Sequence, residues 1–316
     1  MMRYFLGVDG GGTKVEAILT DQNGQIVGAG RSGASNSYFV GKDAALTTVS
    51  NAVNSALDTV DRSDVAKVAI CSAGMKKYRG ELVESLGIAG DRVILQADEL
   101  NVFISALGKE YGAVVLAGTG SFAMGINKKA VRVTIGGWGP VIGDPGSGRW
   151  MAVQALQAVA MEYDGIGPST LLTEKIKGYY SIDNMDDLRR VVVMGNVNAV
   201  PFLVKEAVQA GDRVASTIIN AAAGILASMA NVIITRLDLD HSDYELALTG
   251  GISNFGEFIL QPFMNAVRSV HQNIMIIKPR FAPVLGSVMI AAKEDNVKWS
   301  EETLSNLKES YEKVIW

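Results

Sequence analysis

Cysteine and clustered basic residues are scarce in this chain of 316 residues. Cys71 is the only cysteine, which excludes an internal disulfide and a metal site built from several cysteines of one chain. Lys and Arg never follow one another in runs longer than a pair, and the net charge is −4. A nucleic-acid partner is therefore not expected, because such proteins usually carry a basic face. The nearly cysteine-free composition favours a reducing compartment, and we expect a cytoplasmic protein.

Long apolar runs are also missing from the sequence. The apolar run at 4–8 stops at Asp9 and is too short for a signal peptide. No run of about 18 uncharged apolar residues, the length of a membrane-spanning helix, is found in the sequence. No membrane partner is therefore expected. No helix-turn-helix precedes residue 4, which argues against a DNA-binding repressor.

Two common nucleotide-binding patterns do not apply. The P-loop sequence G-x-x-x-x-G-K-[S/T] is absent, which argues against a P-loop enzyme. A literal G-x-G-x-x-G occupies 28–33, but it follows the third strand of a predicted hairpin rather than the first strand of a βαβ unit. No helix begins directly after it, and no acidic residue ends a strand about 20 residues later. We interpret this match as a coincidence.

What the sequence does contain is a repeated pattern, and the chain is long enough for two domains. Short apolar runs separated by turn residues predict strands, and apolar residues at helical spacing predict a helix over 43–57. The predicted strands of the first half lie at 4–8, 15–19, 25–29, 65–71 and 92–96. The same order begins again about 110 residues later, with strands predicted at 112–117, 122–126 and 130–135. We interpret this as the duplication of a βββαβα unit in an α/β protein.

The duplication predicts two similar lobes, one from 1–110 plus 285–316 and one from 111–284. In the second lobe we expect a helix over 144–161 that begins with Asp144 as N-cap and Pro145 at the first helical position. The remaining predicted helices lie within 166–236, at 283–294 and at 301–315, and the remaining strands at 245–248 and 273–277.

Four glycine-rich turns follow predicted strands, at 10–12, 118–120, 136–139 and 250–251. Glycine permits positive φ and close approach of a ligand, and successive backbone amides can bind phosphate. Any one of these turns is equally explained as a plain hairpin. Two of them at equivalent points of a duplicated unit favour a nucleotide bound between the two halves.

Three aspartates lie beside these turns or at predicted helix starts. Asp9 precedes the first glycine turn, and a carboxylate beside a phosphate is best explained by Mg²⁺ between them, usually through water. Asp98 follows the strand at 92–96 and opens a predicted helix. As a lone aspartate at a helix start, it is equally explained as an N-cap, and the same holds for Asp144.

The motifs resemble those of a known superfamily. Asp9–Lys14, Ala117–Ser121 and Thr249–Gly251 are similar to the two phosphate motifs and the adenosine motif of the hexokinase, actin and heat-shock-chaperone ATPases. The run 136–139, followed by 143–148, resembles more narrowly the N-acetylglucosamine kinase and BadF/BadG/BcrA/BcrD ATPase family. This resemblance extends from residue 5 to about 292. It implies two actin-like (ribonuclease H-like) lobes with ATP in the cleft, and phosphoryl transfer from ATP to a hydroxyl of a 2-amino sugar.

The resemblance also implies roles for individual residues. Asp98 would be the catalytic base, and Asp9 would hold Mg²⁺ through water. The residues implied to contact the sugar are Asn36, Ser72, Gly74, Asp98 and Asp144. The residues implied to bind the nucleotide are Gly10, Gly11, Gly12, Thr13, Lys14, Gly118, Thr119, Gly120, Ser121, Gly250, Gly251 and Asn254.

Three departures from the family pattern lie around the sugar residues. Pro145 stands where the family usually has Glu, Ala73 where the mammalian sugar kinase of the family has glycine, and Glu99 where a small residue is common. The substrate is therefore left open between N-acetylglucosamine, glucosamine, N-acetylmuramic acid and a compound that is not a sugar. A homodimer is expected by analogy alone.

Two other functions remain open at this stage. One is an activator ATPase that couples hydrolysis to electron transfer through an iron–sulfur cluster between two subunits. One cysteine per chain gives a dimer only two thiolates, whereas a four-iron cluster requires about four. The other is a non-catalytic sugar or nucleotide sensor, against which the presence of Asp98 and both phosphate turns argues.

Overall fold

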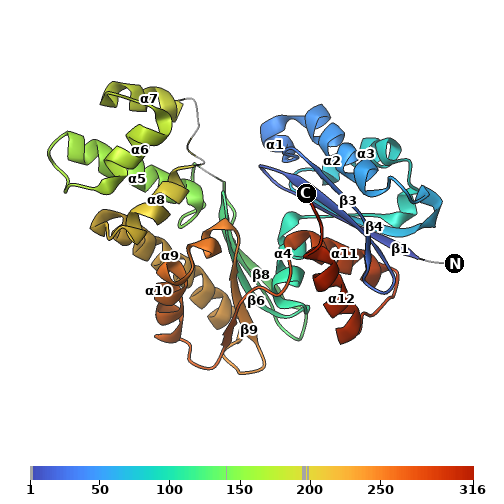
Figure 1. The fold of residues 1–316 in the computed structure, drawn as a ribbon. Coiled ribbons are helices and arrows are strands. Elements are labelled where there is room, and N and C mark those ends of the chain that lie inside the picture. Colours follow the sequence, from blue (N-terminus) through green and yellow to red (C-terminus); the bar gives the residue numbers. More distant parts are fainter. Residues whose placement is uncertain (1–2, 140, 194–196, 198) are drawn as a thin grey trace. The chain divides into compact units, whose positions relative to one another are not determined.

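A computed structural model describes residues 3–139, 141–193, 197 and 199–316 of the chain. The chain divides into two compact units, each with a five-stranded sheet of its own (Figure 1). Unit 1 comprises Met1–Glu110 and Pro279–Trp316, and unit 2 comprises Tyr111–Lys278. Because the last segment of the chain returns to unit 1, that unit contains both chain ends.

The sheet of unit 1 is mixed, with the strand order β3-β2-β1-β4-β5. Its strands are β1 (Tyr4–Gly10), β2 (Val15–Asp21), β3 (Ile26–Ser32), β4 (Val65–Ser72) and β5 (Val93–Gln96). β1 runs antiparallel to β2 and parallel to β4, and β4 runs parallel to β5. β2 runs antiparallel to β3, which confirms the hairpin predicted from the apolar runs at 15–19 and 25–29. Asp21 explains its turn, because Oδ1 of Asp21 accepts hydrogen bonds from the amides of Asn23 and Gln25, both at 2.9 Å.

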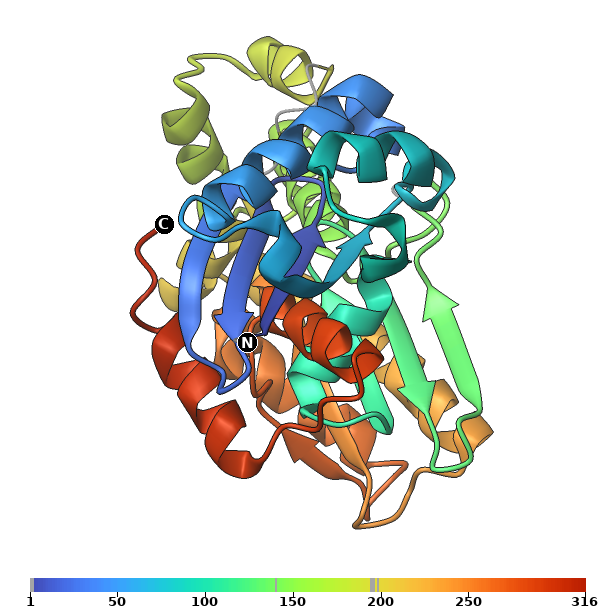
Figure 2. The same cartoon turned by 90° about the vertical axis from the view of Figure 1, so that its right-hand side faces the viewer.

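Helices cover both faces of this sheet. Successive side chains of a strand point to opposite faces, so residues of one strand pack in two separate cores. The helices of unit 1 are α1 (Ser37–Val40), α2 (Lys42–Ala56), α3 (Arg79–Leu86), α4 (Asp98–Leu107), α11 (Pro283–Glu294) and α12 (Glu301–Tyr311). Leu6 and Val8 of β1 pack in the core with α2, whereas Phe5 packs in the core with α11. Figures 1 and 2 show α11 and α12, drawn in red, beside the blue strands from the start of the chain.

The glycines of the G-x-G-x-x-G match have a packing role in β3. A Cβ on Gly28 would lie 2.0 Å from the carbonyl oxygen of Ala56, and one on Gly30 would lie 2.0 Å from that of Ala52. Both oxygens belong to α2, so only glycine allows this helix to lie directly on β3. The match is therefore explained without a dinucleotide.

The sheet of unit 2 repeats the topology of unit 1, with the order β10-β9-β6-β7-β8. Its strands are β6 (Gly112–Ala117), β7 (Ser121–Ile126), β8 (Arg132–Gly136), β9 (Glu245–Thr249) and β10 (Met275–Ile277). β6 is antiparallel to β7 and parallel to β9, as β1 is to β2 and β4. In order across the sheet, β10, β9, β6, β7 and β8 correspond to β5, β4, β1, β2 and β3 of unit 1. The equal order and equal strand directions confirm the predicted duplication.

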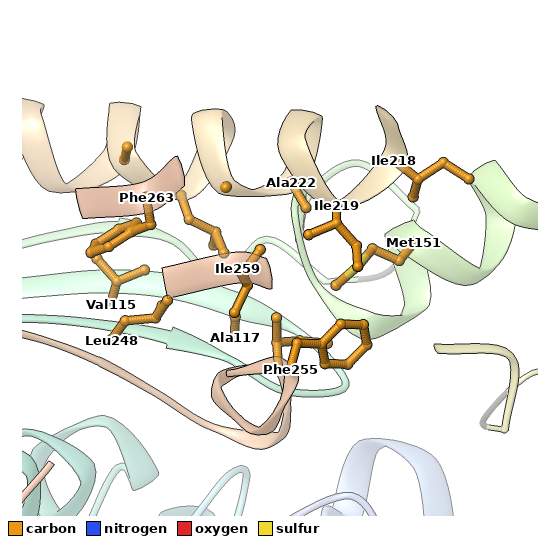
Figure 3. Packing of buried hydrophobic residues seen from close by; sticks show 14 of the residues in the cluster. Val115, Ala117, Met151, Ile218, Ile219, Ala222, Leu248, Phe255, Ile259 and Phe263 are labelled. Carbon is orange, nitrogen blue, oxygen red and sulfur yellow. The ribbon is translucent and has the colours of Figure 1, made fainter. Parts of the chain in front are cut away.

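Helices make up most of the rest of unit 2, and one long helix organises its core. The helices are α5 (Gly148–Tyr163), α6 (Leu171–Tyr180), α7 (Met185–Val193), α8 (Val200–Gln209), α9 (Arg213–Leu237) and α10 (Glu257–Arg268). The predicted helical segment 166–236 thus contains four helices, and it includes residues 194–196 and 198, which lie outside the described residues. Figure 3 shows Ile219 and Ala222 of α9 in the same core as Phe263 of α10 and Val115 of β6.

The sequence predicted no segment long and apolar enough to span a membrane, but α9 is such a segment. This helix passes by length and composition, and it is the one candidate among the described residues. However, 56% of its most apolar window is buried inside the protein. Its alanine and isoleucine face forms the centre of the core of unit 2, so the composition of α9 is that of a core helix.

The predicted start of the helix at Asp144 was wrong. α5 begins at Gly148, and its N-cap is Ser147, whose hydroxyl accepts a hydrogen bond from the amide of Trp150 at 3.1 Å. Asp144 has a φ of 56°, a left-handed conformation that an N-cap does not adopt. Asp144 and Pro145 are locally a good helix start, but the contacts of the preceding loop override this preference.

Candidate functional site

The three parallel strands of unit 1 end at the same edge of the sheet, and each brings a predicted site residue there. Asp9 and Gly10 end β1, Ser72 ends β4, and Asp98 follows β5. Gly10 lies opposite Ser72 in the strand register. Carboxyl ends of neighbouring parallel strands are the usual place for ligands in α/β proteins, because the loops after them converge.

The first glycine turn is closed by a second loop. The amide of Ser35 donates to the carbonyl of Gly11 at 3.0 Å, and the hydroxyls of Ser35 and Ser72, both buried, lie 3.0 Å apart. A Cβ on Gly10 would lie 2.3 Å from Oγ of Ser35 and 2.7 Å from Oγ of Ser72. Gly10 is therefore required by packing, whereas a Cβ on Gly12 would have no atom within 4 Å.

Asn36 and Gly74, predicted to contact the sugar, both lie against the start of the short helix α1. Oδ1 of Asn36 accepts a hydrogen bond from the amide of Tyr38 at 3.1 Å and so caps this helix. Gly74 has a φ of 75°, and a Cβ on it would lie 2.4 Å from Oγ of Ser37. The loop after β4 therefore packs directly on α1. Among the described residues, no hydrogen bond uses the two N–H donors of the Asn36 side chain.

Asp9 has a partner that the sequence did not indicate. Nδ2 of Asn101 donates to Oδ1 of Asp9 at 2.7 Å, across 92 positions of sequence, and Asn101 is completely buried. Burial raises the pKa of Asp9 to about 6, and the negative charges of Glu16 and Asp98 act in the same direction. The hydrogen bond from Asn101 and the charge of Lys14 oppose this rise. A desolvated carboxylate beside two others would be stabilised by a cation.

Asp98 is the first residue of α4 but does not cap it. The N-cap is Ala97, and no side chain caps this helix, so the alternative of a simple N-cap was wrong for Asp98. The side chain is half-buried, and burial raises its pKa above the ordinary value of 3.8, with the charge of Glu99 adding to the rise. The hydrogen bond from its own backbone amide opposes the rise. Asn101 follows one turn later on the same helix.

The rest of the first turn is open to solvent. Gly12, Thr13 and Lys14 are exposed, and the turn is closed by the amide of Gly11, which donates to the carbonyl of Lys14 at 3.0 Å. The ammonium group of Lys14 forms an ion pair with the buried carboxylate of Glu16. Backbone amides at the tip of such a turn are available for an anion.

In unit 2 the second glycine turn is tied to the start of α5. Gly118 donates from its amide to the carbonyl of Gly120 at 2.9 Å, and the amide of Gly148 donates to the carbonyl of Gly118 at 2.8 Å. The hydroxyl of Ser121 donates to the carbonyl of Pro145 at 2.8 Å. Thr119 remains exposed at the tip of the turn.

Asp144 lies against this turn and is buried. A Cβ on Gly120 would lie 2.8 Å from its Oδ2, so glycine is what allows the carboxyl group to approach the turn so closely. The left-handed backbone of Asp144 is uncommon for a residue with a side chain, and such conformations concentrate at functional sites.

The third turn of unit 2 contacts the second one. Gly250 has a φ of 94°, and a Cβ on it would lie 2.5 Å from the carbonyl oxygen of Ala117 at the end of β6. Gly251 opens a short 3₁₀ helix, Gly251–Phe255, in which Asn254 is exposed. Unit 2 therefore assembles the turns at 118–120, 144–148 and 250–251 at the carboxyl ends of β6 and β9.

Neither the cysteine nor a cluster of acidic residues provides a preformed metal site. Burial raises the pKa of the Cys71 thiol to about 12, so the thiolate required for metal ligation is disfavoured. The described part of the chain has no group of three or more His, Cys, Asp or Glu residues that could hold a metal ion. A magnesium ion does not require such a group, because it usually binds one or two carboxylates together with water and substrate phosphates.

Comparison with protein families decides the membership of this chain. The model of the BadF/BadG/BcrA/BcrD ATPase family matches residues 6–291. The chain belongs to the BadF/BadG/BcrA/BcrD ATPase family. Membership of this family implies that the chain binds ATP.

Curated relatives match over nearly their full length. The N-acetyl-D-glucosamine kinase of Dictyostelium discoideum is 27% identical, and the match covers 91% of this chain and 97% of the relative. The N-acetylmuramic acid/N-acetylglucosamine kinase of Clostridium acetobutylicum is 26% identical, with 93% of this chain and 99% of the relative covered. This member of the BadF/BadG/BcrA/BcrD family is thus a distant homologue of amino-sugar kinases.

Solved structures place the fold of this family member among the actin-like ATPases. A candidate N-acetylglucosamine kinase of Chromobacterium violaceum superposes with a TM-score of 0.74 at 23% identity, over 92% of this chain and 99% of the other. A ROK-family glucokinase of Streptomyces griseus superposes with a TM-score of 0.61 at 16% identity, over 94% and 100%. The predicted actin-like fold is therefore confirmed.

Proposed function

We propose that this chain is a cytoplasmic ATP-dependent kinase that phosphorylates a hydroxyl of a 2-amino sugar of the N-acetylglucosamine type. Membership of the ATPase family supports ATP as the phosphoryl donor. The acceptor class is supported by relatives that match over nearly their full length and are named as kinases of N-acetylglucosamine and N-acetylmuramic acid. Two glycine turns with exposed tips, one in each unit, support phosphate binding by backbone amides.

The observation that carries the proposal is the environment of Asp98. It has a half-buried carboxyl at the end of a parallel strand, with a raised pKa and no capping bond. A sugar hydroxyl is a weak nucleophile, and a nearby carboxylate can orient it and accept its proton as the new P–O bond forms. A pKa above the ordinary value of 3.8 makes the carboxylate of Asp98 a better proton acceptor.

Asp9 is the residue of unit 1 that fits a magnesium ion. Its desolvated carboxylate is held in one orientation by Asn101 and directly precedes the glycine turn. We propose that Asp9 holds a hydrated Mg²⁺, which when bound neutralises charge on the phosphates of ATP. The amides of the turns at 10–13 and 118–121 then donate hydrogen bonds to the phosphates, because phosphoryl transfer depends mainly on positioning and electrostatics.

For the acceptor, Asn36 lies beside the packed loop of Ser72 and Gly74, and its side-chain N–H groups donate to no other residue that the structure describes. In unit 2, Asp144 offers a buried acceptor beside the turn at 118–120. We assign these groups to sugar hydroxyls and the acylamino group, and Gly250, Gly251 and Asn254 to the adenosine.

A panel of sugars with coupled detection of ADP tests the proposal. ADP release should depend on N-acetylglucosamine, N-acetylmuramic acid or glucosamine, and mass spectrometry should find a phosphorylated sugar. ADP release that no sugar stimulates would favour the activator-type ATPase of the same family. Binding of ATP and sugar without any turnover would favour a sensor. The buried Cys71 already argues against a cluster-carrying activator, and colourless purified protein would agree.

A further inference from the structure

A small cavity of unit 2 adjoins the second glycine turn. It has a volume of about 200 Å³ and lies where the loop before α5 meets the first turns of that helix. Its lining consists of Val141, Gly143, Asp144, Ser147, Arg149, Trp150 and Val153. Asp144 connects this cavity to the phosphate turn, because its carboxyl group also lies against Gly120.

Two opposite charges line this cavity without neutralising each other. Asp144 is 9% exposed, and no hydrogen bond or ion pair joins its carboxyl group to any residue that the structure describes. Arg149 is exposed, and its guanidinium group likewise has no ion pair or hydrogen bond within the described part of the chain. Asp144 lines the cavity, so a ligand bound there could donate hydrogen bonds to its carboxyl group.

The position of Arg149 is unfavourable for the helix itself. Arg149 is the second residue of α5, and the positive end of the helix dipole repels a cation there. The helix N-terminus and the guanidinium together form a positive region at the cavity mouth. An anion bound at Arg149 would relieve this repulsion, and a carboxylate can accept two parallel hydrogen bonds from a guanidinium group.

We infer that the acceptor of this kinase is a 2-acylamino sugar that carries a carboxylate, with the carboxylate bound by Arg149 and a sugar hydroxyl by Asp144. This inference rests on the proposed kinase function and narrows its substrate. The apolar wall formed by Val141, Trp150 and Val153 suits the short alkyl groups of such a sugar. A neutral amino sugar would leave Arg149 without a ligand.

A phosphate of ATP is the other anion that could reach Arg149. The residues that line the cavity include none from the turn at 118–120, which is the phosphate candidate of this unit. The lining is formed instead by residues of the loop before α5 and of the helix. The lining therefore favours the acceptor sugar over ATP as the source of the anion bound by Arg149. The two sources can be distinguished, because loss of Arg149 would change the preference between sugars in one case and the KM for ATP in the other.

The test compares N-acetylmuramic acid with N-acetylglucosamine, which differ by one carboxylate-bearing lactyl ether. The wild type should use the acidic sugar at least as efficiently as the neutral one, by kcat/KM. In Arg149→Gln, the ratio of kcat/KM for the acidic to the neutral sugar should fall by about tenfold or more, the usual loss for a hydrogen bond to a charged group. At saturating ATP, raising the salt concentration should increase the KM of the wild type for the acidic sugar more than its KM for the neutral sugar.

Arg213→Gln is the matched control, because Arg213 is an exposed arginine in the first turn of α9 and does not line the cavity. The ratio should not change in this variant. A wild type that phosphorylates N-acetylglucosamine but rejects N-acetylmuramic acid would overturn the inference and leave the proposed function intact. An Arg149→Gln variant with a higher KM for ATP and an unchanged sugar ratio would assign the anion to the nucleotide and overturn it as well. A wild type that phosphorylates glucosamine alone would overturn the inference, and one that phosphorylates none of the three sugars would overturn the proposed function itself.

Discussion

Replacing Asp98 by asparagine should abolish most turnover while making the folded protein more stable at neutral pH. Asparagine has nearly the same shape but cannot accept the proton of the sugar hydroxyl. Loss of a general base typically lowers turnover by about 10²–10⁴-fold, which corresponds to about 3–5 kcal/mol of transition-state stabilisation. Binding of ATP and sugar should persist, because the substitution leaves the glycine turns and Asn36 unchanged.

The expected gain in stability follows from the position of the side chain. Asp98 makes no capping bond, so the variant does not lose the roughly 0.5–2 kcal/mol that a cap contributes. A negative charge at a helix start gains about 0.3–1 kcal/mol from the helix dipole. Burial raises the pKa of Asp98, so the charged form of its carboxyl group is disfavoured in the folded protein, and we expect this effect to exceed the gain from the dipole.

The sign of the pH dependence can be derived from this shift. A carboxyl group with a higher pKa in the folded than in the unfolded state stabilises the fold below the unfolded value of about 3.8. That contribution is lost as the pH rises through the folded pKa. Asp98→Asn keeps the neutral form at every pH. Its free energy of unfolding should therefore match that of the wild type near pH 4 and exceed it at pH 7.5.

Urea unfolding between pH 4 and 8 and steady-state kinetics at pH 7.5 test both effects on the same preparations. Asp91→Asn is the control, since Asp91 is an exposed aspartate just before the other end of β5. It should keep wild-type turnover and show no comparable pH-dependent gain. A folded Asp98→Asn variant with more than about a tenth of wild-type turnover, a loss well below the range for a general base, would refute the assigned role. A variant less stable than the wild type at pH 7.5 would refute the argument from burial.

Three further predictions concern the same edge of unit 1. Asp9→Asn should raise the magnesium concentration that gives half-maximal turnover and leave the sugar KM unchanged; equal magnesium dependence in both proteins would contradict the role of Asp9. Asn36→Ser keeps a capping oxygen for α1 but removes the amide donors, so the sugar KM should rise up to about tenfold while the KM for ATP stays constant, and an unchanged sugar KM would remove Asn36 from the site. Gly10→Ala should lower the free energy of unfolding by about 1–3 kcal/mol because its Cβ meets two serine hydroxyls, whereas Gly12→Ala, with open space around its Cβ, should be nearly neutral in urea unfolding; equal stabilities of the two variants would contradict this packing argument.

The sequence alone determined the order of strands and turns, and thereby the duplicated fold. Short apolar runs and glycine breaks are local signals, so the strands that end near Asp9, Ser72 and Asp98 could be found without tertiary information. Parallel strands in one sheet then bring these ends to one edge by topology alone. The glycine turns and their order also placed the chain in its family.

Only the tertiary structure decided the contacts between distant segments. The hydrogen bond from Asn101 to Asp9 joins residues 92 positions apart, and no local pattern distinguishes Asn101 from other polar residues of a helix. The requirement for glycine at position 10 likewise comes from serines of two other loops.

The start of α5 shows why local preference can fail. Asp144 and Pro145 are favourable as N-cap and first helical residue, which is why the sequence predicted a helix there. In the structure the carboxyl group of Asp144 lies against Gly120, and the hydroxyl of Ser121 bonds to the carbonyl of Pro145. These contacts hold Asp144 in a left-handed conformation and leave Ser147 to cap the helix. A capping preference amounts to about 1 kcal/mol, and packing of a buried loop against a neighbouring turn can outweigh it.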